Sequence, residues 1–178
     1  GRLFRDQRMI YMRGQAADYD GWRQAGNPGW GWDDVLPYFT RAEDHYDGPS
    51  PVHGSDGEIR VEKQRLRWDI LESFRAACGE AGIPLIDDFN TGDNEGASFF
   101  QVTQRSGWRW IASDAFLKPV RDRANLKIVT GALVDKVVVE QGRAVGVAYR
   151  LGNTSHIARA AGEVLLSASA IGSPAILE

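Results

Sequence analysis

The sequence has little that could crosslink it, anchor it in a bilayer or bind a metal. Its one cysteine, Cys78, cannot form an internal disulfide, and no run approaches the roughly 18 apolar residues needed to span a membrane. Neither Cys78 nor the three histidines show a CxxC or HxxxH spacing, so no metal site is predicted. The formal net charge of −3 gives no electrostatic reason to expect a nucleic acid or an anionic membrane as a partner.

Two motifs of common enzyme sites are also absent. A GxSxG nucleophile elbow does not occur, and neither does the GxGxxG turn that holds a dinucleotide. The histidines are scattered, and none matches a catalytic motif. His53, in the run HGSDG, is expected to be a hydrogen-bonded turn residue, His156 to be exposed, and Cys78 to be a buried core thiol. We therefore assign no catalytic residue.

The composition is that of a soluble globular protein. Of the 178 residues, 43% are hydrophobic and 25% charged, which suffices for a proper core. With no secretion signal and one cysteine, a cytoplasmic location is expected. Six tryptophans are many for this length; we interpret them as core and hinge anchors, with a carbohydrate-binding surface as the alternative.

The first two thirds of the chain read as a mixture of helices, strands and loops. Asp33 is expected to cap a helix in whose first turn Pro37 is tolerated, and Gly82 is expected to end another. The apolar positions of the second helix keep the rhythm of one buried face. The predicted helices are 33–43, 69–81 and 113–117, and the predicted strands are 58–62 and 98–104.

From residue 125 onward the pattern is that of short strands. Strands at 133–140, 144–150 and 156–160 are typical of an antiparallel meander that turns first at Gln141-Gly142. Further strands are predicted at 126–130 and 164–166, the latter as a strand buried on both faces. It leads into a turn of small residues, Ala168 to Pro174, which opens a helix as phosphate-binding turns do.

Five stretches together resemble the glucose–methanol–choline (GMC) family of flavin-dependent oxidoreductases, in particular its choline dehydrogenase-like branch. They are RGQAADYDGW from Arg13, GNPGW from Gly26, GWRWIASDAFL from Gly107, TGALV from Thr130 and SASAIGSP from Ser167. Their order along the chain is more specific than any one of them. Two positions depart from the family pattern, with Ile111 in place of a small hydroxyl residue and Ser169 in place of glycine.

The resemblance implies a mixed α/β fold, with part of a Rossmann-like FAD-binding domain, including its antiparallel meander, and part of a substrate-binding domain. It assigns residues 1–57 to a region joining the two domains, 58–120 to the substrate-binding domain and 121–178 to the FAD-binding domain. The implied cofactor is FAD, contacted by the main chain of Val134 and by the small-residue turn at Ala168, Ser169 and Ala170. The implied reaction oxidises a primary alcohol, such as choline, to an aldehyde, in a dehydrogenase or an oxidase.

Other family segments have no counterpart in this sequence. Between Arg2 and Met9 the family has a GGSSxxN stretch against the flavin, where this chain reads RLFRDQRM, and the catalytic histidine region is lacking. We therefore expect a fragment that is inactive by itself. The alternative is a non-catalytic module that binds a small ligand or a partner protein, with possible self-association through exposed core surface. A tryptophan-based sugar-binding module ranks third.

Overall fold

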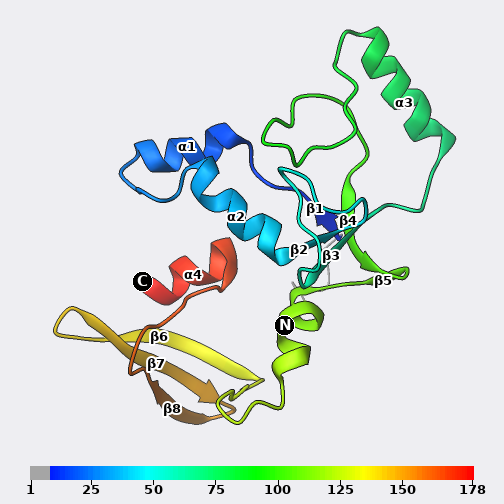
Figure 1. Cartoon of the computed structure of the whole chain (residues 1–178). Helices are drawn as coiled ribbons and strands as arrows, with labels where there is room; N and C mark the ends of the chain where they lie inside the picture. The colour runs from blue at the N-terminus through cyan, green and yellow to red at the C-terminus, as the bar shows by residue number, and fades with distance from the viewer. Residues whose placement is uncertain (1–8) are drawn as a thin grey trace. The chain divides into compact units, whose positions relative to one another are not determined.

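The computed structural model describes residues 9–178, and the chain forms two compact units, the first ending at Arg123 and the second running from Ala124 to Glu178. Each unit contains its own sheet, and both sheets include antiparallel pairs (Figure 1). The expected GGSSxxN position, between Arg2 and Met9, lies almost wholly outside the described residues.

The described part of the first unit is built on a mixed sheet of five short strands: β1 (Ile10–Tyr11), β2 (Glu43–His45), β3 (Ile59–Lys63), β4 (Gln101–Arg105) and β5 (Trp108–Arg109). Their order is β1-β4-β3-β2, and β5 pairs with β4. Only β2 and β3 are parallel to each other in this sheet of described residues. β2 was not expected, because Glu43 was predicted to end the preceding helix.

Helices α1 (Ala16–Gln24) and α2 (Trp32–Ala42) follow each other and are capped by carboxylates. At α1, Asp18 Oδ2 accepts a hydrogen bond from the Gln15 amide at 2.8 Å. At α2, Asp34 Oδ2 accepts one from the Gly31 amide at 3.0 Å, so the predicted cap at Asp33 is wrong. The helix starts one residue earlier, where a carboxylate in its third position can reach back to the N-cap amide. Pro37 consequently lies inside α2, beyond its first turn.

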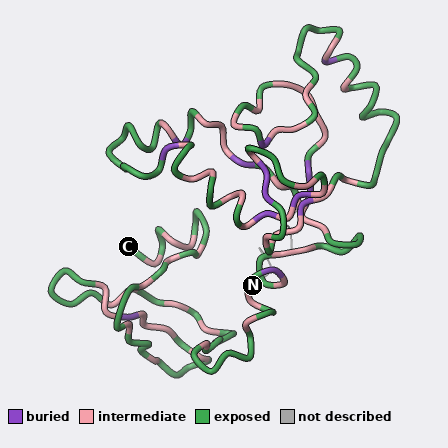
Figure 2. The backbone as a smooth tube through the Cα atoms, viewed as in Figure 1, coloured by how far each residue is buried: buried purple, intermediate pink, exposed green. Residues whose placement is uncertain are grey.

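The interior of the first unit is unusually polar. Most of the backbone is exposed or half-buried (Figure 2). Among the described residues of this unit, few apolar side chains are buried, whereas six polar or charged residues are: Arg13, Glu43, His45, His53, Asn90 and Gln101. A buried polar group must find hydrogen-bond partners, because losing water without replacement costs free energy. The arrangement of these six residues therefore decides how the unit is held together.

Helix α3 (Asp69–Glu80) confirms the predicted helix but not its predicted burial. Cys78 is buried as expected, and Gly82 follows the helix with a φ of +83°. Ile70 and Phe74, predicted to face the core, are 69% and 68% exposed. The apolar residues do lie on a helix as predicted, but the prediction that Ile70 and Phe74 are buried is wrong for the described residues. Among residues 9–178, no helix is both long and apolar enough to cross a membrane.

The chain then passes through the short helices η2 (Ser113–Leu117) and η3 (Lys118–Val120). The first confirms the helical turn predicted at residues 113–117, as one turn of π-helix.

The second unit is the predicted meander followed by a helix. Strands β6 (Ala132–Glu140), β7 (Arg143–Leu151) and β8 (Thr154–Arg159) pair in sequence order, each antiparallel to the next. The β6–β7 turn uses Gln141 and Gly142, both at positive φ, as a tight two-residue hairpin requires. Helix α4 (Ser169–Leu177) contacts β6.

The strands predicted at residues 126–130 and 164–166 do not form. The second of these was expected to be buried on both faces, yet Leu165 is 85% exposed. A parallel strand forms only beside neighbours that complete its hydrogen-bond ladder, and the described part of the chain offers none at this position. The prediction of a strand at residues 164–166 is therefore wrong for this structure.

Candidate functional site

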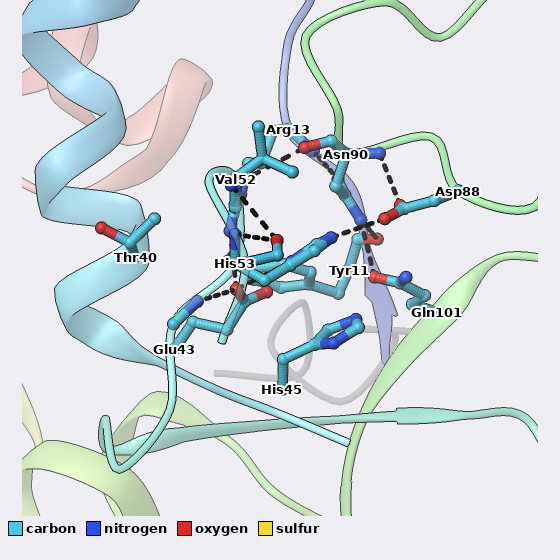
Figure 3. Close-up of polar contacts among 12 residues, drawn as sticks. Tyr11, Arg13, Thr40, Glu43, His45, Val52, His53, Asp88, Asn90 and Gln101 are labelled. Atoms are coloured by element: carbon cyan, nitrogen blue, oxygen red, sulfur yellow. Dashed lines mark hydrogen bonds and ion pairs between the residues drawn. The ribbon is translucent and has the colours of Figure 1, made fainter. Parts of the chain in front are cut away.

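The described residues concentrate their buried charge around Glu43, the first residue of β2 (Figure 3). Its carboxylate is fully buried, and Oε2 accepts three hydrogen bonds. They come from Arg13 Nη2 at 2.9 Å, from His53 Nδ1 at 3.0 Å and from the Gly54 amide at 3.0 Å. Burial would raise the pKa of Glu43, but these donors together lower it. Glu43 is therefore ionised at neutral pH.

His53 lies between two carboxylates. Its Nδ1 faces Glu43, and its Nε2 lies 2.5 Å from Asp88 Oδ2. A ring nitrogen can bond to an ionised carboxylate only by donating, so both nitrogens must carry a proton. Burial by itself would lower the pKa of His53, but the hydrogen bonds to Asp88 and Glu43 raise it to about 9. Conversely, the pKa of Asp88 is lowered, against the effect of burial, by His53 and by the Asn90 amide.

His45 is the neutral neighbour of this imidazolium. Its ring stacks on that of His53, with centroids 3.8 Å apart and planes 14° from parallel. Burial lowers the pKa of His45, and the positive charge of His53 lowers it further. Its Nδ1 accepts a weak hydrogen bond from the Asp47 amide at 3.4 Å, which leaves the proton on Nε2. The two histidines are eight residues apart and match no motif, so their contact was not predicted.

Asn90 ties the network to β1 and β4. Its side-chain oxygen accepts a hydrogen bond from the Arg13 amide at 2.7 Å. Its Nδ2 donates hydrogen bonds to the Tyr11 carbonyl at 3.3 Å and to Gln101 Oε1 at 2.9 Å. Its own amide donates to Asp88 Oδ1 at 2.7 Å. The network thus connects three regions that are up to 79 residues apart in the sequence.

One ring nitrogen of His45, one of His53 and a carboxylate oxygen of Asp88 lie within 4.8 Å of one another, which is close enough to suggest a metal site. The geometry does not fit one. Both nitrogens of His53 are already directed at carboxylates, and two nearly parallel rings do not aim their lone pairs at a common point. Arg13 and His53 also balance the charges of Glu43 and Asp88. The positive charge of protonated His53, rather than a metal ion, therefore completes this cluster.

The residues predicted to contact FAD lie in the second unit. Val134 is in β6 opposite Tyr149, directly before a shift in the β6–β7 register. Ala168 and Ser169 form the start of α4, and the Ala168 amide donates to Ser173 Oγ at 3.0 Å. Ser169 has a φ of +72°, a conformation that favours glycine. That conformation gives a physical reason for the glycine that the family usually has here.

This turn has features that suit a cofactor. Ser169 and Ala170 are exposed and small, so a ligand can approach their backbone closely. α4 also presents the unpaired amides of its first turn, and that turn holds no acidic residue to repel a phosphate. The turn at Ala168, Ser169 and Ala170 is therefore suited to a phosphate-bearing cofactor, and the role of these residues and of Val134 remains a prediction.

A family model described as GMC oxidoreductase matches residues 8–178. The chain belongs to the GMC oxidoreductase family. The sequence is 41% identical over 169 residues to mitochondrial choline dehydrogenase of Homo sapiens, an alignment that covers 95% of this chain and 28% of that protein. It is 40% identical to the oxygen-dependent choline dehydrogenase of Brucella ovis, covering 95% of this chain and 31% of that one. The chain thus spans less than a third of the length of these relatives.

The fold is shared with a solved structure of a flavoprotein. An FAD-dependent oxidoreductase from Chaetomium thermophilum superposes with a TM-score of 0.86 and 29% identity, over 96% of this chain and 32% of that one. The resemblance to the family and the mixed α/β fold class, both predicted from the motifs, are confirmed.

The buried network was missed by sequence reasoning. His53 was correctly expected to be hydrogen-bonded, but its partners Glu43 and Asp88 were not identified. Both carboxylates occur in polar stretches where nothing in the sequence marks them as buried. His156 is half-buried against Tyr149 rather than exposed, with ring centroids 5.3 Å apart.

Proposed function

We propose that this chain is part of an FAD-dependent GMC oxidoreductase that acts on CH–OH donors and oxidises a primary alcohol such as choline to an aldehyde. The observation that carries the proposal is the family match over residues 8–178, together with the 41% identity to a choline dehydrogenase. Because the chain spans 28% of that relative, the activity is proposed for a whole enzyme of which this chain forms one part.

In this proposal three parts of the chain have different tasks. Residues 58–120 contribute to the substrate-binding domain, residues 121–178 to the FAD-binding domain, and residues 1–57 join them. FAD, when bound, supplies the acceptor for the hydride that leaves the alcohol carbon. The chain's own part would be to bind and orient the cofactor, with the Val134 main chain contacting it and the turn at Ala168–Ala170 allowing it to approach the backbone closely.

The described histidines support the prediction that the isolated chain is inactive. Alcohol oxidation needs a base that can reach the hydroxyl proton. Both nitrogens of His53 are bonded to carboxylates, His45 is buried against it, and His156 is stacked on Tyr149. None of the three is poised to accept a proton from a substrate.

The test is the visible absorbance spectrum of the purified chain after incubation with FAD and desalting. Retained flavin bands that are weakened by Ser169→Leu but not by Glu140→Gln would support the assigned cofactor turn. A folded chain that retains no flavin would overturn the assignment for this chain, and alcohol-dependent dye reduction by the isolated chain would overturn its inactivity.

A second candidate is a non-catalytic module that associates with itself or a partner protein. The observation in its favour is the exposed apolar face of α3, where Ile70 and Phe74 are each more than two-thirds exposed. Sedimentation velocity distinguishes the two, because a compact monomer at high concentration would remove this candidate. A cytoplasmic location also remains a proposal, and the human relative is named as a mitochondrial protein.

A further inference from the structure

A small pocket in the first unit is lined by α3, the end of β3 and the start of β4. Its volume is about 240 Å³, below the roughly 300–1,000 Å³ of drug-sized sites, so it can hold only a small ligand. Its lining combines cationic side chains with aromatic rings, and it includes Lys63, Arg75, Phe99, Phe100 and Gln101. We call it the cationic pocket.

None of the six tryptophans lines the cationic pocket. Trp22, Trp30, Trp68 and Trp108 are each more than half exposed, so the prediction that the tryptophans are core anchors is wrong for these four. A ligand of the cationic pocket therefore contacts none of the side chains for which a carbohydrate-binding surface was considered.

The buried network fixes the direction in which the side-chain amide of Gln101 points. Asn90 Oδ1 accepts a hydrogen bond from the Arg13 backbone amide, so Asn90 Nδ2 must be the donor on the other side of its amide group. That nitrogen donates to Gln101 Oε1 at 2.9 Å (Figure 3). Gln101 is 5% exposed, and its Nε2 is a buried donor without a partner among the described residues. Because a buried N–H without a partner is unfavourable, this atom favours a ligand that accepts hydrogen bonds.

Arg75 provides a second unpaired donor in the same lining. Its Nη2 donates to the Ile86 carbonyl at 3.3 Å and lies 3.5 Å from Asp87 Oδ1. Its Nε is buried and has no partner within residues 9–178. The Asp87 side chain is fully exposed, so water screens its attraction for Arg75. The guanidinium group of Arg75 therefore keeps both a free N–H and a charge that a ligand can use.

The charge of the lining favours an anion. Three cationic side chains and two carboxylates line the pocket, which leaves one net positive charge. Lys63 is the cation of this set that forms no ion pair with another described residue, and its Nζ lies 5.0 Å from the centroid of the Tyr46 ring. One net positive charge matches a singly charged anion better than a phosphate, which carries nearly two negative charges at neutral pH.

We propose that the cationic pocket binds a small monocarboxylate with an apolar body. Carboxylate oxygens accept hydrogen bonds from neutral amides and from guanidinium groups alike, so they suit Gln101 Nε2 and Arg75 Nε, while Lys63 balances the charge. The rings of Phe99 and Phe100 offer apolar surface for the rest of the ligand. The alcohol and the aldehyde of the proposed oxidation carry no carboxylate, and the proposal does not depend on FAD.

The probe is sodium benzoate, followed through the side-chain N–H resonances of Gln101 Nε2 and Arg75 Nε in two-dimensional NMR of the purified chain. We expect saturable shifts of both resonances. Benzamide has the same shape without the charge and should bind at least about tenfold more weakly. Equal binding of benzoate and benzamide, shifts that sodium chloride reproduces at the same ionic strength, or tighter binding of inorganic phosphate would overturn the proposal.

Variants separate the pocket from the net charge of the chain. Lys63 is exposed, so Lys63→Met should leave the fold intact and weaken benzoate binding about tenfold, whereas Lys63→Arg should retain most of it. The matched control is Lys136→Met, which removes an exposed lysine from β6 and should leave binding unchanged. An equal loss in Lys63→Met and Lys136→Met would contradict the assignment, because the effect would then come from net charge.

A further variant tests the buried amide. Gln101→Glu keeps an acceptor for Asn90 but replaces the unpaired donor with a carboxylate oxygen, so benzoate binding should be lost. Cooperative thermal unfolding shows whether this variant is folded, and Lys63→Met tests the pocket if it is not. Benzoate binding that survives in both variants would rule out the cationic pocket as its site.

Discussion

Different interactions stabilise the interior of each of the two units of this chain. In the first unit, Arg13, Glu43, His53 and Asp88 form charged contacts between segments up to 35 residues apart, and Asn90 adds hydrogen bonds across 77 residues or more. In the second, β6, β7 and β8 each pair with the next strand in the sequence, and the ion pairs are on the surface. A sheet of successive hairpins distributes its stability over many similar contacts, whereas a buried charge cluster depends on each of its members.

The largest effect should follow from removing the central carboxylate. Glu43→Ala leaves the buried charge of Arg13 without its carboxylate and His53 with Asp88 alone, and should destabilise the first unit by about 3–5 kcal/mol. All six tryptophans lie in this unit, so urea unfolding followed by tryptophan fluorescence reports on it alone.

The matched control is Glu72→Ala, which removes a carboxylate from an exposed pair with Arg67. This substitution should lower the free energy of unfolding by less than about 1 kcal/mol. If both variants lose the same stability, the buried cluster is not what holds the unit. If Glu43→Ala also abolishes the circular dichroism of the second unit, the two units are not independent.

The next effect is a loss of stability at alkaline pH that is confined to the first unit. The pKa of His53 is raised from 6.5 to about 9, so its stabilisation is fully present below about pH 6.5 and is lost as pH rises through 9. This difference in the pKa of His53 corresponds to roughly 3 kcal/mol in the free energy of unfolding. On the acid side, the lowered pKa values of Glu43 and Asp88 give stability that is present above about pH 4 and lost as pH falls further.

Tryptophan-detected unfolding between pH 5 and pH 10 measures this dependence. The variant His53→Gln should be less stable at pH 6.5 and should show little further loss up to pH 9.5. A wild-type stability that stays constant from pH 7 to pH 10 would rule out the imidazolium between the two carboxylates.

The smallest effect concerns the turn at the start of α4. Ser169 has a φ of +72°, which costs a non-glycine residue about 1 kcal/mol, so Ser169→Gly should stabilise the second unit by about that amount. Ala170→Gly, one residue further into the helix, should instead destabilise it by about 0.5–1 kcal/mol. Thermal unfolding followed by far-ultraviolet circular dichroism compares the two. A destabilising Ser169→Gly would show that the serine side chain contributes more than the backbone conformation costs.

The sequence predicted the second unit, whose contacts are local, better than the first. The prediction of the meander was correct because alternation within a strand and a Gln141-Gly142 turn are local signals. Helix α3 was correct for a similar reason, although its pattern could not say what would cover Ile70 and Phe74. The run at 164–166 failed as a strand because a parallel strand depends on neighbours rather than on its own residues.

The buried network could not be predicted from local signals. Glu43 looked like the end of a helix, and Asp88 and Asn90 like residues of a polar loop. Their burial depends on Arg13 and His53, which lie 30 residues before Glu43 and 35 residues before Asp88. The FAD-contact assignments at Val134 and Ala168–Ala170 came from family resemblance and stay predictions.

The separation between Arg13 and Asn90 has a consequence for synthesis of the chain. At about 5–20 residues per second, a ribosome needs roughly 4–15 s to add the 77 residues between them. During that interval Glu43 and Arg13 have been made, but the segment that completes their cluster has not. The first unit therefore depends on a late-arriving piece of chain, and contacts of such long separation fold slowly. In the meander of the second unit each strand pairs with the next one in the sequence, so its partner is the next strand to be made.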